Sequence, residues 1–195
     1  MEVLENLKKY RVILASKSPR RQQVLAQLCV DFDVEVLPGV DESYPADLPL
    51  DEIPLHIARK NLEAHRVLIE SNELIITSDT VVILGDKVLG KPADAQEAKA
   101  MLQALANCTH RVTTGVAIAS KDKELSFGVT TEVDFSPLSE AEIDFYISRF
   151  KPMDKAGAYG IQEWIGAAGI TGIRGSFYNV MGLPLRRLYE ALKEF

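Results

Sequence analysis

An aspartate interrupts the long apolar run that extends from Leu74 to Leu84. A carboxylate removed from water without a partner costs several kcal/mol or takes up a proton. Asp79 therefore needs a divalent cation, a group of lysines and arginines, or a proton that it abstracts during a reaction. Strand alternation also allows Asp79 to be an ordinary solvated acid that points outward. We favour a functional acid, because so apolar a segment is a costly place for a carboxylate.

A second unusual feature is a helix whose first turn is expected to be basic. Residues 11–15 predict a strand, and Ser18 is expected to cap a helix that carries Arg20 and Arg21 in its first turn. That turn normally holds carboxylates, because its exposed N–H groups form a positive end. The two guanidinium groups, these N–H groups and the hydroxyls of Ser16 and Ser18 could converge on one phosphate chain. The alternative is a solvated turn whose arginines pair with distant carboxylates.

Other acids could complete a metal site with Asp79. Asp41 and Glu42 follow a turn at Pro38 and Gly39. Carboxylate oxygens suit Mg²⁺ or Mn²⁺, which keep some of their waters and bridge substrate phosphates. The alternative is an acidic loop that is simply solvated. The three histidines and two cysteines lack the spacing of a metal site.

Two further segments could contact a nucleotide. The run from Gly85 to Lys91 begins like a phosphate-binding loop, but Pro92 stands where that loop needs a hydroxyl. Lys91 is then either a separate phosphate contact or a surface lysine. Residues 151–175 are rich in glycine and aromatic side chains, and Gln162 could donate and accept hydrogen bonds at the edge of a base. Loops rich in glycine are also commonly structural.

Apolar runs and helix-period segments must position these residues. The predicted strands are 12–15, 32–37, 74–84, 87–89, 111–120, 125–135 and 177–180. Helices are expected after Ser18, over 54–70, after capping boxes that begin at Asp94 and Ser139, and from Pro184 to about residue 193. Hairpins are predicted at 85–86 and 121–123. The pattern indicates one α/β domain with a mixed sheet, which could have two lobes.

Composition excludes several classes of partner. The chain has 195 residues, of which 47% are hydrophobic and 26% charged, with a net charge of −6. This acidic balance disfavours a nucleic acid polymer or an anionic membrane as partner. No stretch approaches the roughly 20 apolar residues of a membrane span, and no signal peptide is recognisable. We therefore expect a cytoplasmic protein.

Several motifs follow one another in order over nearly the whole chain. They are Ala15-Ser16-Lys17-Ser18-Pro19-Arg20-Arg21, Ser78-Asp79-Thr80, Gly90-Lys91-Pro92, Asp154-Lys155-Ala156-Gly157-Ala158-Tyr159-Gly160-Ile161-Gln162 and Met181-Gly182-Leu183-Pro184. Taken together, they resemble the motifs of the Maf family of nucleotide pyrophosphatases. The resemblance implies a Maf-type mixed sheet flanked by helices, with two lobes around a central cleft, in a single domain over 1–195. It also implies a cytoplasmic homodimer that hydrolyses nucleoside triphosphates to monophosphate and pyrophosphate with a divalent cation.

The resemblance assigns roles residue by residue. Asp79 corresponds to the general base, and Glu42 to an acid near the metal. Substrate-side residues are expected at Ser16, Ser18, Arg20, Arg21, Lys91 and Lys155. Within the family, Arg21, Thr80 and Gln162 are similar to the branch that acts on dTTP and UTP, not to the branch for 7-methyl-GTP.

Three positions depart from the family pattern. Asn61 stands where the family usually has lysine, Ser78 where alanine is common, and Glu163 where a small residue is usual. Lys60 is not expected to replace the missing lysine, because one residue along a helix turns the side chain by about 100°.

The implied reaction is attack of water on the α-phosphorus, assisted by a divalent cation, with Asp79 as base and the basic groups stabilising the pyrophosphate leaving group. Two alternatives stay open. The first is an enzyme for modified or non-canonical nucleotides, and the second is a non-catalytic nucleotide-binding regulator of cell division.

Overall fold

The computed structural model describes residues 3–67, 69, 70 and 72–195. The chain divides into two compact units. Unit 1 consists of the residues up to Asp79 together with Thr114–Val129 and Gly182–Phe195. Unit 2 consists of Thr80–Thr113 and Thr130–Met181. This division agrees with the two lobes expected from the sequence.

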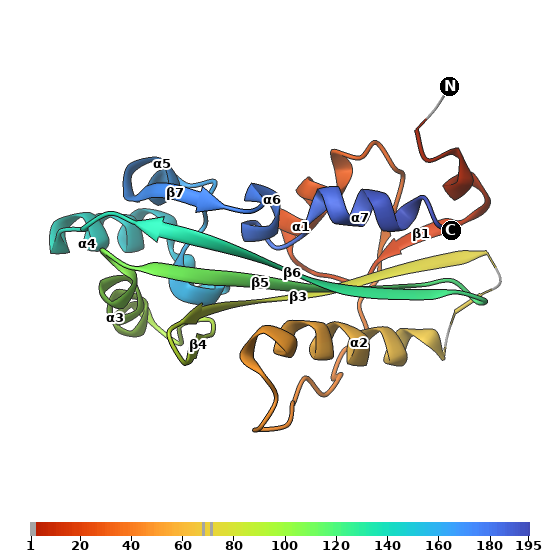
Figure 1. Cartoon of the computed structure of the whole chain (residues 1–195), viewed down its shortest axis with the longest axis horizontal. Coiled ribbons are helices and arrows are strands. Elements are labelled where there is room, and N and C mark those ends of the chain that lie inside the picture. Colours follow the sequence, from red (N-terminus) through yellow and green to blue (C-terminus); the bar gives the residue numbers. More distant parts are fainter. Residues whose placement is uncertain (1–2, 68, 71) are drawn as a thin grey trace. The chain divides into compact units, whose positions relative to one another are not determined.

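A mixed sheet runs through the chain (Figure 1). Its strands are β1 (Arg11–Leu14), β2 (Asp33–Val34), β3 (Glu73–Leu84), β4 (Lys87–Leu89), β5 (Thr109–Ala119), β6 (Glu124–Phe135) and β7 (Ile170–Arg174). The order is β2-β1-β3-β5-β6-β7, and β4 pairs with β3 outside this path. β1 is parallel to β2 and β3, whereas β4 is antiparallel to β3 and β7 is antiparallel to β6. The predicted mixed α/β fold and the hairpin at residues 85–86 are thus confirmed.

Helices connect these strands. The α-helices are α1 (Pro19–Ala26), α2 (Ile53–Arg66), α3 (Ala95–Leu105), α4 (Glu140–Phe150), α5 (Trp164–Gly169), α6 (Phe177–Val180) and α7 (Leu185–Leu192). Short 3-10 helices occupy Glu5–Lys9, Leu50–Glu52, Pro152–Asp154 and Ala156–Ala158. Among the described residues, no helix has both the length and the apolar character needed to cross a membrane.

The two predicted capping boxes differ in outcome. At α4, Ser139 accepts from the backbone of Glu142 and the Glu142 carboxylate accepts in return, so this box is confirmed. At α3, Asp94 accepts from the backbone N–H groups of two first-turn residues at 2.9 Å each. The Glu97 carboxylate, however, accepts from Ala93 at 2.7 Å, one residue before the cap. The prediction of a box at Asp94 was therefore wrong, although the cap itself is correct.

Three other element predictions require correction. Residues 177–180 form helix α6 instead of a strand, because the Ser176 hydroxyl accepts from the N–H of Asn179 and caps a helical turn. Strand β2 shortens from the predicted 32–37 to two residues, at the sheet's edge where only β1 pairs with it. Helix α2 ends at Arg66, and position 68 of the longer prediction lies outside the described residues.

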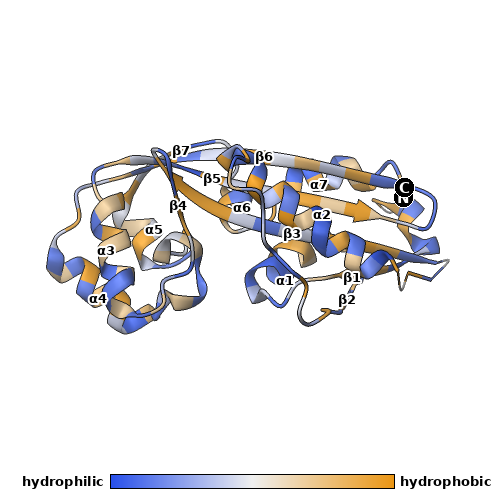
Figure 2. Cartoon of the chain, turned by 90° about the horizontal axis from the view of Figure 1, so that it is seen from below, coloured by the Kyte–Doolittle hydropathy of each residue, from blue (hydrophilic) through white to orange (hydrophobic). Residues whose placement is uncertain are grey.

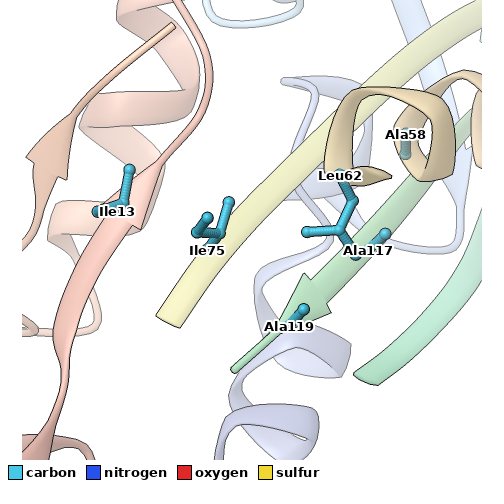
Figure 3. Close-up of a cluster of buried hydrophobic side chains, with 6 residues drawn as sticks. All are labelled: Ile13, Ala58, Leu62, Ile75, Ala117 and Ala119. Carbon is cyan, nitrogen blue, oxygen red and sulfur yellow. The ribbon is translucent and has the colours of Figure 1, made fainter. Parts of the chain in front are cut away.

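The core of unit 1 lies between α2 and the strands β1, β3 and β5. Six buried side chains meet there, namely Ile13, Ala58, Leu62, Ile75, Ala117 and Ala119 (Figure 3). Small residues on β5 allow the helix to approach closely. At Gly115 an added Cβ would lie 2.2 Å from the backbone nitrogen of Leu55. The Thr77 hydroxyl on β3 donates to the carbonyl of Ala58 at 2.8 Å, which fixes α2 against the strand that carries Asp79.

In unit 1, α7 lies on the face of the sheet opposite α2 (Figure 1). It buries Leu185, Leu188, Ala191 and Leu192. In unit 2, α3 packs beside α4. Both helices show hydrophobic and hydrophilic segments in Figure 2, as expected for helices with one buried side. A buried aromatic group in the same unit joins His110, Phe135 and Tyr159, with ring centroids 5.0–5.4 Å apart.

Candidate active site

The N-terminus of α1 begins as the sequence predicted. Ser18 is the N-cap, and its hydroxyl accepts from the N–H of Arg21 at 3.5 Å. Pro19 occupies the first helical position, and the first turn holds no acidic residue. The helix therefore presents backbone N–H groups together with Arg20 and Arg21. Such a helix end favours an anion, because the helix dipole, the backbone N–H groups and the guanidinium groups all present positive charge there.

The Arg21 side chain is held in place by two oxygens of unit 1. Its Nε donates to the carbonyl of Gly182 at 2.9 Å, and its Nη1 donates to the Ser16 hydroxyl at 3.3 Å. Ser16 is buried, and its hydroxyl also accepts from the N–H of Ser18 at 3.3 Å. The hydrogen bonds from a planar guanidinium fix both its position and its orientation. A ligand that reaches this site thus meets a guanidinium that is already oriented.

Two carboxylates act on this guanidinium. Burial lowers the pKa of Arg21, the negative charge of Asp79 raises it, Arg20 adds to the lowering, and Glu42 raises it again. Asp79 is half-buried on β3, directly after five buried residues of the strand and the buried Ser78. Asp79, Glu42 and Arg21 therefore lie close enough in unit 1 for the two negative charges to act on the guanidinium.

The loop at residues 41–43 is organised by α2. Lys60 Nζ donates to Asp41 Oδ2 at 2.8 Å and to the Ser43 carbonyl at 3.0 Å. Lys60, followed by the backbone and hydroxyl of Ser43, holds the pKa of Asp41 well below its usual range. Asn61 Nδ2 donates to Glu42 Oε1 at 3.3 Å and to the carbonyl of Ile57 at 3.1 Å. Lys60 is thus engaged with Asp41, and the amide of Asn61 contacts Glu42.

The donor set suits a cation that arrives with a phosphate. The charges of Glu42 and Asp79 both act on the Arg21 guanidinium, and carboxylate oxygens suit Mg²⁺ or Mn²⁺ in chemical type. Over the ranges that the structure describes, no group of three or more His, Cys, Asp or Glu side chains could hold a metal by itself.

The remaining predicted site residues belong to unit 2. Thr80 is half-buried on β3, whereas Lys91 and Gln162 are exposed. Gly90, which precedes Lys91, accepts from the N–H of Gly157 at 3.0 Å. Lys155 is buried, and its Nζ lies 2.7 Å from Asp154 Oδ1 and 3.2 Å from Glu163 Oε1. The Lys155 ammonium is thus already paired with two carboxylates.

Sequence reasoning missed three contributors to these contacts. The carbonyl of Gly182 has no side-chain signature, and only its place in a recognised motif pointed to it. The sequence shows Asn61 only as a departure from the usual lysine, whereas in the structure its amide donates to Glu42. Glu163 was seen only as an unusual residue, although its carboxylate contacts both Lys155 and Tyr146.

The chain is similar to several known proteins. The family model described as "Maf-like protein" matches residues 11–195. A dTTP/UTP pyrophosphatase of Parabacteroides distasonis is 53% identical over 193 residues, which is 99% of this chain and 100% of the relative. One from Phocaeicola vulgatus is 52% identical over 192 residues, which is 98% of this chain and 100% of the relative. Among solved structures, a HAM1 protein from Coxiella burnetii aligns over 95% of this chain and 100% of that chain, with 15% identity and a TM-score of 0.48.

Proposed function

This chain belongs to the Maf family, and from that premise we propose that it hydrolyses dTTP and UTP to the nucleoside monophosphate and pyrophosphate. Relatives named dTTP/UTP pyrophosphatase, which are 52–53% identical over nearly the full chain, support this substrate class. The observation that carries the proposal is the position of Asp79. A half-buried carboxylate on an apolar strand acts on Arg21, at a helix end that is built to bind an anion.

Different residues of unit 1 carry out different parts of the proposed reaction. The Asp79 carboxylate takes a proton from the water molecule that attacks the α-phosphorus. Arg20, Arg21 and the N–H groups of α1 bind the phosphate chain and stabilise the negative charge that develops on the pyrophosphate leaving group. Ser16 and Ser18 act at the same helix end, where the Ser16 hydroxyl orients Arg21. These groups contribute mainly by position and charge.

A divalent cation, when bound, supplies positive charge that neutralises the phosphate oxygens. Glu42 and Asp79 would hold it, and the Glu42 carboxylate is oriented for this role by Asn61. The cation is expected to bind much more tightly when nucleotide is present, because phosphate oxygens then add ligands to the two carboxylates.

Four residues of unit 2 are proposed substrate contacts because of their places in motifs of the family. Lys91 and Lys155 are assigned to the phosphate groups, and Thr80 and Gln162 to the choice of uracil or thymine. Amide and hydroxyl groups that pair with one base edge reject another base, because the wrong partner leaves buried polar groups unpaired. We further propose a single catalytic domain over 1–195, which works as a homodimer in the cytoplasm and uses neither a nucleic acid polymer nor a membrane as partner.

A nucleotide panel tests the proposal. The protein is incubated with Mg²⁺ or Mn²⁺ and each common nucleoside triphosphate, and the products are separated by ion-exchange chromatography. We expect dTTP and UTP to be consumed fastest, with monophosphate and pyrophosphate formed in equal amounts. Release of diphosphate and inorganic phosphate would contradict the reaction. Faster turnover of GTP or of a modified nucleotide would contradict the substrate class, and binding without turnover would indicate a regulator.

A further inference from the structure

A buried polar cluster in unit 2 joins Tyr146 on α4 to the turn that carries Gln162. The Tyr146 hydroxyl contacts Glu163 Oε2 and accepts from the N–H of Gly160 at 3.0 Å. Glu163 Oε1 lies 3.2 Å from the Lys155 ammonium. Tyr146 is fully buried, and the side chains of Lys155 and Glu163 are only 8% and 17% exposed. We define Tyr146, Lys155 and Glu163 as the turn clamp.

The turn clamp holds both ends of one tight turn. The N–H of Glu163 donates to the carbonyl of Gly160 at 3.0 Å, which closes the backbone over residues 160–163. The Tyr146 hydroxyl contacts the first residue of this turn through its backbone and the last through its side chain. Gln162 lies between them and is exposed. The backbone position of Gln162, from which its side chain extends, is therefore set by a turn that is fixed at both ends.

The surroundings of the turn leave it little freedom. An added Cβ at Gly160 would lie 3.0 Å from Cδ of Glu163 and 3.1 Å from Cε of Lys155. The Tyr146 ring stacks on Phe150 with centroids 5.2 Å apart. Lys155 supplies the positive charge that a poorly hydrated Glu163 carboxylate requires. The three side chains therefore form one closely packed unit in which each partner depends on the others.

From these contacts we propose that the turn clamp is a positioning device for base selection: it fixes Gln162 so that its amide pairs with uracil or thymine and not with cytosine. Uracil presents a carbonyl where cytosine presents an amino group, so a fixed amide distinguishes them by donor and acceptor pattern, whereas a freely rotating amide does not. Tyr146, Lys155 and Glu163 act through Gln162 and need no contact of their own with the base. The inference rests on the proposed function, since it assigns Gln162 to the base.

The test compares UTP with CTP in two clamp variants. Tyr146→Phe keeps the ring and removes the hydroxyl that holds both ends of the turn, and Glu163→Gln keeps the shape and removes the charge. For each protein, kcat/KM is measured for both nucleotides, and Kd is measured for UMP and CMP by calorimetry. We expect the UTP preference to fall by about tenfold or more in Tyr146→Phe, and by less in Glu163→Gln, whose side-chain oxygen can still accept from Tyr146.

A double-mutant cycle separates positioning from general stability. In a Gln162→Ala background, Tyr146→Phe should cause no further loss of base preference, because the side chain through which the clamp acts is absent. Tyr189→Phe, which removes a tyrosine hydroxyl on α7 in unit 1, is the matched control and should leave the preference unchanged. Thermal unfolding is measured to show that each variant is folded. If Tyr146→Phe does not fold, the loss of UTP preference is measured in Glu163→Gln alone.

The outcomes distinguish this inference from the proposed function. An unchanged UTP preference in both clamp variants would overturn the inference. An equal loss of UTP preference on Tyr146→Phe in the wild-type and the Gln162→Ala backgrounds would also overturn it. Wild-type protein that hydrolyses no triphosphate would contradict the proposed function. In that case, the UMP and CMP dissociation constants still decide the role of the clamp, and equal wild-type affinities for both would overturn it.

Discussion

The negative charge of Asp79 on β3 acts on the guanidinium of Arg21 in the first turn of α1. Arg21 is in turn fixed by the carbonyl of Gly182 and the hydroxyl of Ser16. Three segments that are distant in sequence thus meet at one guanidinium in unit 1. An acid on an apolar strand and a basic residue at a helix N-terminus are each unfavourable alone. Together their opposite charges offset one another.

The first prediction concerns the geometry of Arg21. Arg21→Lys keeps the positive charge but loses the planar group that reaches Gly182 and Ser16 at the same time. We expect kcat/KM for UTP to fall on the order of 100-fold, as for loss of one oriented donor to a charged transition state. Pyrophosphate release measures this. Arg187→Lys, on the exposed side of α7, is the control and should retain wild-type activity, and an equal effect of both substitutions would contradict the role of Arg21.

A second prediction follows from the hydrogen bond between Asn61 and Glu42. Asn61→Ala removes the amide that orients this carboxylate. If Glu42 holds the cation, the Mn²⁺ concentration for half-maximal activity should rise roughly tenfold, the lower end of the effects seen when a residue that orients a metal ligand is lost. Activity at saturating Mn²⁺ should be largely retained. The measurement is a Mn²⁺ titration with UTP, together with Mn²⁺ binding followed by calorimetry.

An exposed residue of the same helix provides the control for this titration. Glu63 lies on α2 and is exposed. Glu63→Gln should therefore leave the Mn²⁺ dependence close to that of the wild type. Identical Mn²⁺ curves for Asn61→Ala and wild type would show that Glu42 does not need Asn61 for this role.

Local sequence signals predicted the elements that depend on local chemistry. Ser18 and Pro19 fixed the start of α1, and Ser139 with Glu142 fixed the start of α4. The same kind of reasoning failed at residues 177–180, where an apolar and aromatic run favoured a strand. Its backbone is instead set by the cap at Ser176 and by the buried Asn179, whose amide donates to the carbonyl of Val112 at 3.0 Å. That tertiary contact overrides the β propensity of the segment.

The site shows a similar division. The unusual positions of Asp79 and Arg21 are visible in the sequence. A carboxylate is costly in an apolar strand, and a basic residue is unfavourable in the first turn of a helix. Glu163 and Asn61 violate no such rule, so the sequence showed only that these residues differ from the family pattern. Their importance arises from partners on other elements, Tyr146 for Glu163 and Glu42 for Asn61. Contacts of this kind depend on the packed fold and leave no local pattern.

A third prediction concerns pH and the stability of the fold. Burial lowers the pKa of His110 from 6.5 to about 4, although the charge of Asp134 partly opposes this shift. Between these two values the unfolded chain binds more protons than the folded one, so the free energy of unfolding falls as the pH falls. We expect a loss of about 2 kcal/mol between about pH 7.5 and pH 5, from roughly 1.4 kcal/mol per unit of pKa difference.

Urea unfolding at a series of pH values measures this loss. The range stops near pH 5, because carboxylates begin to take up protons below it. His110→Gln removes the titrating ring next to Tyr159, whose hydroxyl lies 2.7 Å from His110 Nε2. The slope of stability against pH should be much smaller in this variant. A wild-type stability that does not change over the range would be inconsistent with a buried neutral His110.

The most direct test of the account is Asp79→Asn, which keeps the size of the side chain and removes its ability to accept a proton. Pyrophosphate release from UTP and the equilibrium affinity for UTP are measured on the same preparation. We predict that turnover with Mg²⁺ falls by about 1,000-fold or more, within the range found for general bases, while UTP measured without a divalent cation binds within about threefold of wild type. Turnover at the wild-type rate would show that Asp79 is not the base and would contradict the central claim.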